Sequence, residues 1–132
     1  MSASLKNVGV ITLFVEDPQR SKAFYERVFE LPAIFEDANS AVFRFENMLI
    51  NLLVHSEASE LIAPGTVAPL GAGSSFQFTI WVDDTDAVCE ELATRGVTLL
   101  NGPIDRVWGV RTATFADPDG HVWEIAQQLG SN

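Results

Sequence analysis

The stretch VGVITLFVED, residues 8–17, decides the fold because its pattern recurs in SFQFTIWVDD, residues 75–84. Both stretches are rich in β-branched and aromatic side chains, which are typical of strands. Each one ends in a hydrophobic residue followed by two acidic residues. The second stretch begins 67 residues after the first, about half of the 132-residue chain. This pattern predicts an internal duplication.

The segments after the two stretches are also similar. The carboxylate of Asp17 can accept hydrogen bonds from free backbone N–H groups at the start of a helix over residues 18–29. Asp84 can do the same for a second helix, which Gly96 ends. Each helix has hydrophobic residues at a helical spacing, so each is expected to bury one face against a sheet.

Further strands are expected after each helix. Their ranges are 33–36, 41–45 and 48–54 in the first half, and 97–100, 110–116 and 122–127 in the second. The tetrapeptide Asp117-Pro118-Asp119-Gly120 predicts a tight turn before the last strand. The sequence therefore predicts one α+β domain over residues 1–132, made of two βαβββ modules. The modules are expected at about 7–54 and 75–129, and the Pro- and Gly-containing segment 55–74 between them is interpreted as a linker or flap.

Composition limits the partners and the compartment. The chain has 8 basic and 18 acidic residues, a formal net charge of −10, which would repel nucleic acid and attract cations. No run approaches the length of a membrane span, and no secretory signal is recognised, so a cytoplasmic protein is expected. Cys89 is the single cysteine, which excludes an internal disulfide and a multi-cysteine metal site.

Together with the duplicated layout, several motifs give the chain a resemblance to the vicinal oxygen chelate superfamily, which includes glyoxalase I, bleomycin and fosfomycin resistance proteins and extradiol dioxygenases. The motifs are Val15-Glu16-Asp17, Ser21 and Phe24-Tyr25 in the first half, and Phe115-Ala116-Asp117-Pro118-Asp119-Gly120-His121 and Trp123-Glu124-Ile125 in the second. The resemblance covers residues 7–129. It implies two modules whose curved mixed sheet surrounds a cavity, usually in a homodimer, and it implies a divalent metal in the enzymes of the superfamily.

The resemblance also indicates where metal ligands would stand. Those positions hold Val10, Asn51, Gln77 and Glu124, which are a hydrocarbon, two neutral amides and one carboxylate. A divalent cation needs several charged or imidazole ligands to offset the loss of its water shell. His55, after a strand end, and His121, in the turn, stand at none of these positions. The sequence therefore predicts no metal and no other cofactor.

Alternation along the strands predicts a mostly hydrophobic and aromatic lining with a few polar groups, as in pockets for organic ligands. Trp108, followed by Gly109, is expected to stack on a planar ligand, and Arg111 to pair with a ligand oxygen. Alternatively, Trp108 covers the core or a dimer contact, and Arg111 pairs with a neighbouring acid. Glu124 is either a general base or counter-ion, or a carboxylate hydrogen-bonded to Gln77. The predicted ligand-binding residues are Phe14, Asn51, Gln77, Trp81, Trp108, Arg111 and Glu124.

Two functions from different classes remain open. The first is a metal-free protein that binds an aromatic or cationic small molecule, such as an antibiotic, as a homodimer. The second is a metal-dependent lyase, isomerase or dioxygenase, similar to lactoylglutathione lyase, with an atypical ligand set built from Gln77, Glu124 and one of the histidines. No nucleophile with a matched acid and base is recognised, so Glu124 is the one catalytic candidate.

Overall fold

Two units make up the chain, and the boundary between them falls between Leu70 and Gly71. The computed structural model describes residues 5–130. Unit 1 is the part up to Leu70, and unit 2 is the part from Gly71 onward. The boundary lies inside the segment 55–74 that was expected to join the modules.

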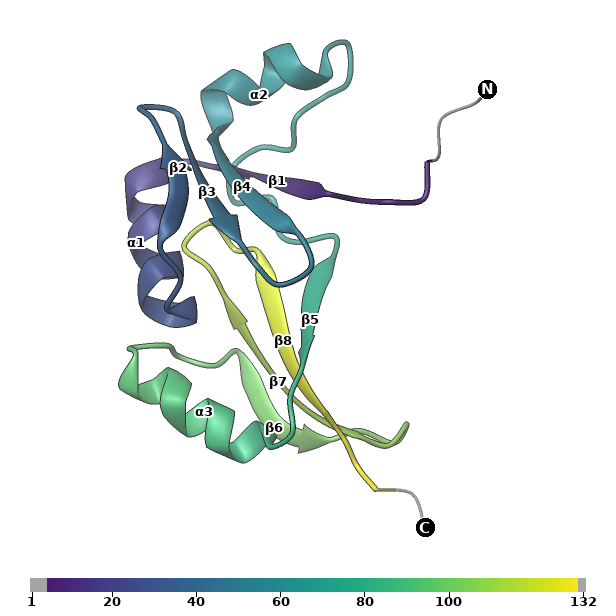
Figure 1. Cartoon of the computed structure of the whole chain (residues 1–132). Coiled ribbons are helices and arrows are strands. Elements are labelled where there is room, and N and C mark those ends of the chain that lie inside the picture. Colours follow the sequence, from purple (N-terminus) through teal and green to yellow (C-terminus); the bar gives the residue numbers. More distant parts are fainter. Residues whose placement is uncertain (1–4, 131–132) are drawn as a thin grey trace. The chain divides into compact units, whose positions relative to one another are not determined.

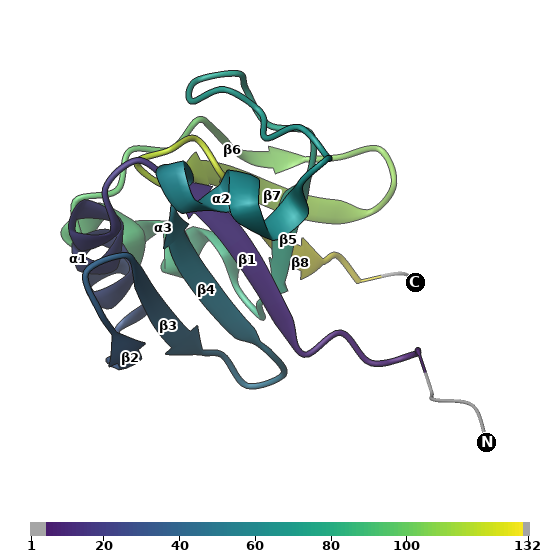
Figure 2. The same cartoon turned by 90° about the horizontal axis from the view of Figure 1, so that it is seen from above.

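Unit 1 is a four-stranded mixed sheet with two helices (Figure 1). Its elements are β1 (Val10–Val15), α1 (Pro18–Phe29), β2 (Ala33–Glu36), β3 (Ser40–Arg44), β4 (Leu49–Val54) and α2 (His55–Ile62). The strand order is β1-β4-β3-β2, with β1 parallel to β4 and the other neighbours antiparallel. Figure 2 shows β1, β4 and β3 side by side in this order.

Unit 2 repeats this arrangement with one helix. Its elements are β5 (Gln77–Trp81), α3 (Thr85–Thr94), β6 (Asn101–Asp105), β7 (Val110–Ala116) and β8 (Val122–Gln128). The strand order β5-β8-β7-β6 matches that of unit 1, and β5 is likewise parallel to β8. The predicted α+β class and the two βαβββ modules are confirmed.

The helix starts are explained by the predicted caps. Oδ1 of Asp17 accepts hydrogen bonds from the backbone N–H groups of Gln19 (3.0 Å) and Arg20 (3.4 Å). Oδ1 of Asp84 accepts one from the N–H of Ala87 at 3.1 Å. These bonds satisfy N–H groups that have no partner within the first turn of a helix.

Each unit has its own hydrophobic core between helix and sheet. In unit 1, Tyr25 of α1 is fully buried, and its ring centroid lies 5.8 Å from that of Phe43 on β3. In unit 2, Phe78 of β5 stacks on Trp123 of β8 with ring centroids 4.3 Å apart. Strand residues that alternate with these buried ones point to the other face of each sheet, which carries no helix of the βαβββ pattern. We call this second face the open face of the unit.

The prediction of a strand over residues 97–100 is wrong. Gly96, with φ 81°, ends α3, and the N–H of Val97 still bonds to the carbonyl of Leu92, so this stretch begins as the end of the helix. The strand β6 begins at Asn101 instead. Its Gly102-Pro103 looks like a turn in the sequence but lies in an edge strand where the register with β7 shifts.

The interpretation of residues 55–74 as a linker or flap needs a correction. Its first part forms the helix α2, in which Ala58 is fully buried. Val54 precedes this helix and provides no side-chain cap, so the usual start signal is missing. The Pro and Gly residues that suggested a linker all come after the helix.

Among the residues that the structure describes, none of the helices has both the length and the hydrophobicity needed to cross a membrane.

Candidate functional site

The open face of unit 2 brings together three predicted site residues. Gln77 and Trp81 lie on β5, and Glu124 lies on β8, its neighbour in the sheet. On β5 the side chains alternate between exposed and half-buried, which is the predicted orientation. Trp81 is 60% exposed, an unusual state for an indole side chain. The open face of this unit therefore combines an aromatic surface with a carboxylate and an amide.

A hydrogen bond fixes the carboxylate of Glu124. Thr79 stands opposite Glu124 in the parallel pair of β5 and β8, and its hydroxyl donates to Oε1 of Glu124 at 2.9 Å. One alternative from the sequence was a hydrogen bond between Glu124 and Gln77. However, Gln77 stands opposite Val122, two residues before Glu124 on β8. Thr79 therefore orients the carboxylate, and the second oxygen of Glu124 is left for other contacts.

Unit 1 contains the equivalent pair in neutral form. Thr12 of β1 stands opposite Asn51 of β4, and Nδ2 of Asn51 donates to Oγ1 of Thr12 at 3.4 Å. Phe14 lies two residues further along β1, half-buried on the same face. The duplication therefore extends to the polar pair on the open face, with an amide in unit 1 and a carboxylate in unit 2.

The side chains at the superfamily's metal-ligand positions do not fit a divalent metal. Val10 and Asn51 in unit 1 provide a hydrocarbon and an amide. Gln77 and Glu124 in unit 2 provide an amide and one carboxylate that is already hydrogen-bonded to Thr79. A set with one charged ligand and no imidazole is poor for zinc and for harder cations alike. Within residues 5–130, no three His, Cys, Asp or Glu side chains gather as a metal site would need.

Both histidines have local partners. Nε2 of His55 lies 2.9 Å from the carbonyl oxygen of Ala68, which is in the segment after α2. Nδ1 of His121 lies 2.8 Å from Oδ2 of Asp117 in the turn between β7 and β8. Burial opposes the charged form of His121, but the hydrogen bond to Asp117 and the charges of Asp117 and Asp119 together raise its pKa above the usual value.

Trp108 lies in the tight turn between β6 and β7. It is 70% exposed, and the guanidinium carbon of Arg106 lies 6.0 Å from its ring centroid. Gly109 has φ 90°, a backbone conformation that favours glycine. The alternative in which Trp108 covers the core does not fit this exposure. Its proposed stacking on a ligand stays a prediction.

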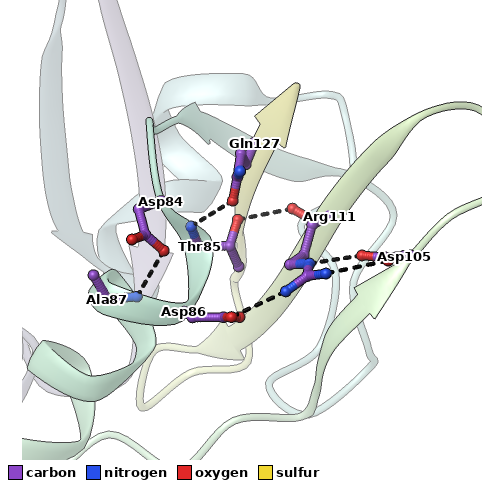
Figure 3. A network of polar contacts seen from close by, with 7 residues as sticks. All are labelled: Asp84, Thr85, Asp86, Ala87, Asp105, Arg111 and Gln127. Atoms are coloured by element: carbon purple, nitrogen blue, oxygen red, sulfur yellow. Dashed lines mark hydrogen bonds and ion pairs between the residues drawn. The ribbon is translucent and has the colours of Figure 1, made fainter. Parts of the chain in front are cut away.

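The structure does not bring Arg111 to the open face. Arg111 stands opposite Gln127 in the sheet, on the side that faces α3 (Figure 3). Its guanidinium forms a bidentate pair with Asp105, at 2.6 and 3.2 Å, and also contacts Asp86 of α3 at 2.9 Å. The pairing with neighbouring acids, which the sequence left open, is therefore the arrangement found.

A hollow of about 360 Å³ lies at the end of β5 and β8. Its lining residues are Trp81, Val82, Asp83, Gln127 and Gln128. Oε1 of Gln127 accepts a hydrogen bond from the N–H of Thr85 at 2.9 Å, which ties the hollow to the first residue of α3 (Figure 3). Within the described residues, Asp83 has no hydrogen-bond or ion-pair partner.

Sequence reasoning missed Asp83, Gln127 and Gln128 as lining residues. The signal for Asp83 was present, because the alternation 77, 79, 81 continues to 83 along the strand direction. The N–H of Val82 still bonds to the carbonyl of Ala126, so the pairing extends past the last residue of β5. The two glutamines depend on where β8 ends, which composition and turn signals do not indicate.

Two βαβββ units in one chain define a class of proteins built from two such modules. In each unit, a threonine pairs with a polar side chain on the open face. The chain belongs to the Glyoxalase/Bleomycin resistance protein/Dioxygenase superfamily, whose family model matches residues 7–125. This confirms the resemblance that the motifs indicated.

Solved structures share the fold over nearly the whole chain. A glyoxalase/bleomycin resistance protein/dioxygenase from Nocardioides has a TM-score of 0.87 at 20% identity, covering 99% of this chain and 89% of that one. A glyoxalase-related enzyme from Fulvimarina pelagi has a TM-score of 0.79 at 26% identity, covering 94% of this chain and 89% of that one.

A sequence relative named metallothiol transferase FosB, from Lysinibacillus sphaericus, is 24% identical over 92% of this chain and 82% of its own length.

Proposed function

We propose that this protein binds an aromatic or cationic small organic molecule, such as an antibiotic, without a metal ion. The observation that carries the proposal is the open face of unit 2. There the exposed indole of Trp81 shares a face with the carboxylate of Glu124, which lies two residues before Trp81's neighbour Ala126 on β8 and which Thr79 holds in place. An aromatic face attracts planar rings and cations, and a carboxylate is a counter-ion for a cation.

The charge of the chain supports the same ligand class. A net charge of −10 raises the local concentration of cations and disfavours anionic ligands. Phe14 and Asn51 offer a second hydrophobic and polar surface in unit 1. Arg111 is not required, because Asp105 and Asp86 neutralise its guanidinium.

Isothermal titration against a panel of planar, cationic and glycopeptide antibiotics tests the proposal directly. The protein is treated with a chelator and dialysed before titration. We expect at least one ligand to bind this metal-free protein at micromolar concentration. Binding that is restored only by added divalent metal would contradict the metal-free proposal, as would no binding below millimolar concentration across the panel.

Trp108 provides a separate test of the stacking prediction. If its exposed ring stacks on the ligand, Trp108→Ala weakens binding by about 1–3 kcal/mol and leaves the fold intact. The affinity is measured by titration, and the fold by the far-UV circular dichroism spectrum. Trp123→Phe is unsuitable as a control because Trp123 is buried in the core. Leu61→Ala, at an exposed position on α2 in unit 1, serves instead and should leave the affinity unchanged.

A metal-dependent enzyme is the second candidate, favoured by the similarity to a relative that is named a metallothiol transferase. Elemental analysis of protein purified without added metal separates the two candidates. About one transition-metal ion per chain, lost in Glu124→Ala, would favour the enzyme. A homodimer is a further part of the proposal, and sedimentation equilibrium at micromolar concentration is expected to give twice the chain mass of 14.4 kDa.

A further inference from the structure

Unit 2 has a second carboxylate on the other side of Trp81. Asp83 lines the hollow of about 360 Å³ together with Trp81, and it has no hydrogen-bond or ion-pair partner within the described residues. Glu124 stands opposite Thr79, two residues before Trp81, and Asp83 stands two residues after it. The indole therefore lies between two carboxylates along the direction of β5.

The spacing of these charges can be derived from the strand. Val82 continues the pairing of β5 with β8, since its N–H bonds to the carbonyl of Ala126 at 2.9 Å. Extended chain rises about 3.3 Å per residue, so the positions of residues 79 and 83 are separated by roughly 13 Å. A molecule that reaches both carboxylates must therefore be long, and the exposed indole between them favours a flat aromatic centre.

No basic side chain competes for these two acids within the described part of the chain. On the strands of unit 2, Arg111 is held by Asp105 and Asp86 on the side that faces α3. Arg106 lies over the ring of Trp108 and donates to the hydroxyl of Thr112. The two carboxylates are therefore free to act as counter-ions for a ligand.

We propose that unit 2 binds a planar aromatic dication, with Trp81 as the stacking surface and with Glu124 and Asp83 as counter-ions for the two positive ends. The proposal rests on the proposed function and narrows it to one ligand class. Gln127 and Gln128 complete the hollow, and Gln128 offers an amide group to the end of the ligand near Asp83.

The test compares diminazene, an aromatic bis-amidine, with the neutral bis-amide of the same ring system. Isothermal titration at low salt measures both affinities for the full chain. We expect the bis-amidine to bind at least tenfold more tightly, because the two ligands share shape and aromatic area and differ in charge. Equal affinities for the two ligands would overturn the proposal.

Single substitutions locate the effect. Glu124→Gln and Asp83→Asn keep the side-chain shape and are each expected to weaken diminazene binding roughly fivefold, since a partly exposed ion pair contributes up to about 1 kcal/mol. The affinity for the bis-amide should not change. Trp81→Leu should weaken the binding of both diminazene and the bis-amide. The matched control is Glu90→Gln, at an exposed position on α3. It removes one negative charge, as each of the two site substitutions does, and should change the affinity less than twofold.

Failure of this inference can be told apart from failure of the proposed function. If diminazene does not bind but another organic compound of the panel binds without metal, the dication is excluded and the proposed function stands. The same holds if Glu124→Gln and Asp83→Asn behave like Glu90→Gln. If no organic compound binds without metal, both are excluded. Unfolding midpoints in urea show whether each variant is folded.

Discussion

The side-chain carboxylate of Asp117 holds the turn between β7 and β8 through contacts with Asp119 and His121. Oδ1 of Asp117 accepts from the N–H groups of Asp119 and His121, each at 2.9 Å, and Oδ2 lies 2.8 Å from Nδ1 of His121. The carboxylate of Asp117 is fully buried. A buried carboxylate is costly without such partners, so this residue pair should affect stability and its dependence on pH.

The raised pKa of His121 determines whether its contribution to the free energy of unfolding rises or falls with pH. Because the charged form is favoured in the folded chain, its contribution is fully present below the unfolded pKa of about 6.5 and is lost as pH rises through the higher folded pKa. We expect His121→Asn to reduce the free energy of unfolding by about 1–3 kcal/mol near pH 6 and by less near pH 9. Urea unfolding across this pH range measures it. A difference that grows with pH would contradict the stabilising role of charged His121. The control is His55→Asn, at a histidine that contacts a backbone carbonyl.

Gly102 is required by both its conformation and its surroundings. Its φ is 95°, and a Cβ added there would overlap the carbonyl oxygen of Thr112 and the backbone of Ala113 on β7. Gly120 has nearly the same φ, 91°, but open space around it. Gly120→Ala is therefore expected to cost about 1–2 kcal/mol from backbone strain alone, and Gly102→Ala at least about 1–3 kcal/mol more because β6 must move from β7. Equal losses in thermal or urea unfolding would show that β6 adapts freely.

The start of α3 shows how an element is fixed to its sheet. Thr85 is fully buried, its hydroxyl donates to the carbonyl of Arg111 at 2.9 Å, and its N–H donates to Oε1 of Gln127 (Figure 3). The side chain of Arg111 connects the same helix to β6 through Asp86 and Asp105. One turn of helix is therefore linked to three strands of unit 2 by polar contacts.

Thr85→Val tests this link. The substitution keeps the shape of the side chain and removes the hydroxyl, so we expect a loss of about 1–2 kcal/mol in the free energy of unfolding. Thr94→Val removes a comparable bond, from Oγ1 of Thr94 to the carbonyl of Glu91, at an exposed helix end, and should cost less than about 0.5 kcal/mol. Urea unfolding of both variants gives the comparison. A loss at Thr85 no greater than at Thr94 would mean that water replaces the buried hydroxyl.

Elements with strong local signals could be predicted from the sequence. The helix α1 and the strand β7 have the predicted bounds, because the cap at Asp17 marks where α1 begins and the turn at 117–120 marks where β7 ends. The helix α2 has no cap signal, and the start of β6 depends on pairing with β7, so neither could be derived from local pattern. The facing of Arg111 also depends on pairing, because β7 is buried on both faces and its sequence shows no alternation of polar and hydrophobic residues.

The site residues likewise include some that local pattern predicts and some that depend on strand pairing. The face shared by Gln77, Trp81 and Glu124 can be derived from the period of a strand and from the superfamily resemblance. Thr79 could be placed on that face, but its bond to Glu124 depends on the register of β5 with β8. Register depends on pairing between segments that are far apart in the chain, so the local sequence pattern does not provide it.

Across the whole molecule, the excess of acidic residues is the property that a cationic ligand would meet first. The chain carries a net charge of −10, spread over both halves. Such a field accelerates the association of a cation, and salt screens it over a Debye length of about 10 Å at 0.1 M. The contacts at Trp81 are short-ranged and should depend little on salt.

We therefore expect salt to separate the two contributions to binding. Between 0.05 and 0.5 M NaCl, the association rate of a dicationic aromatic ligand should fall roughly tenfold or more, whereas its dissociation rate should change less. A neutral ligand of the same shape should show neither change. Stopped-flow fluorescence measures both rates, with the quenching of tryptophan emission as the signal. An association rate that does not depend on salt would mean that the acidic surface does not guide the ligand, and that the aromatic contact at Trp81 alone carries recognition.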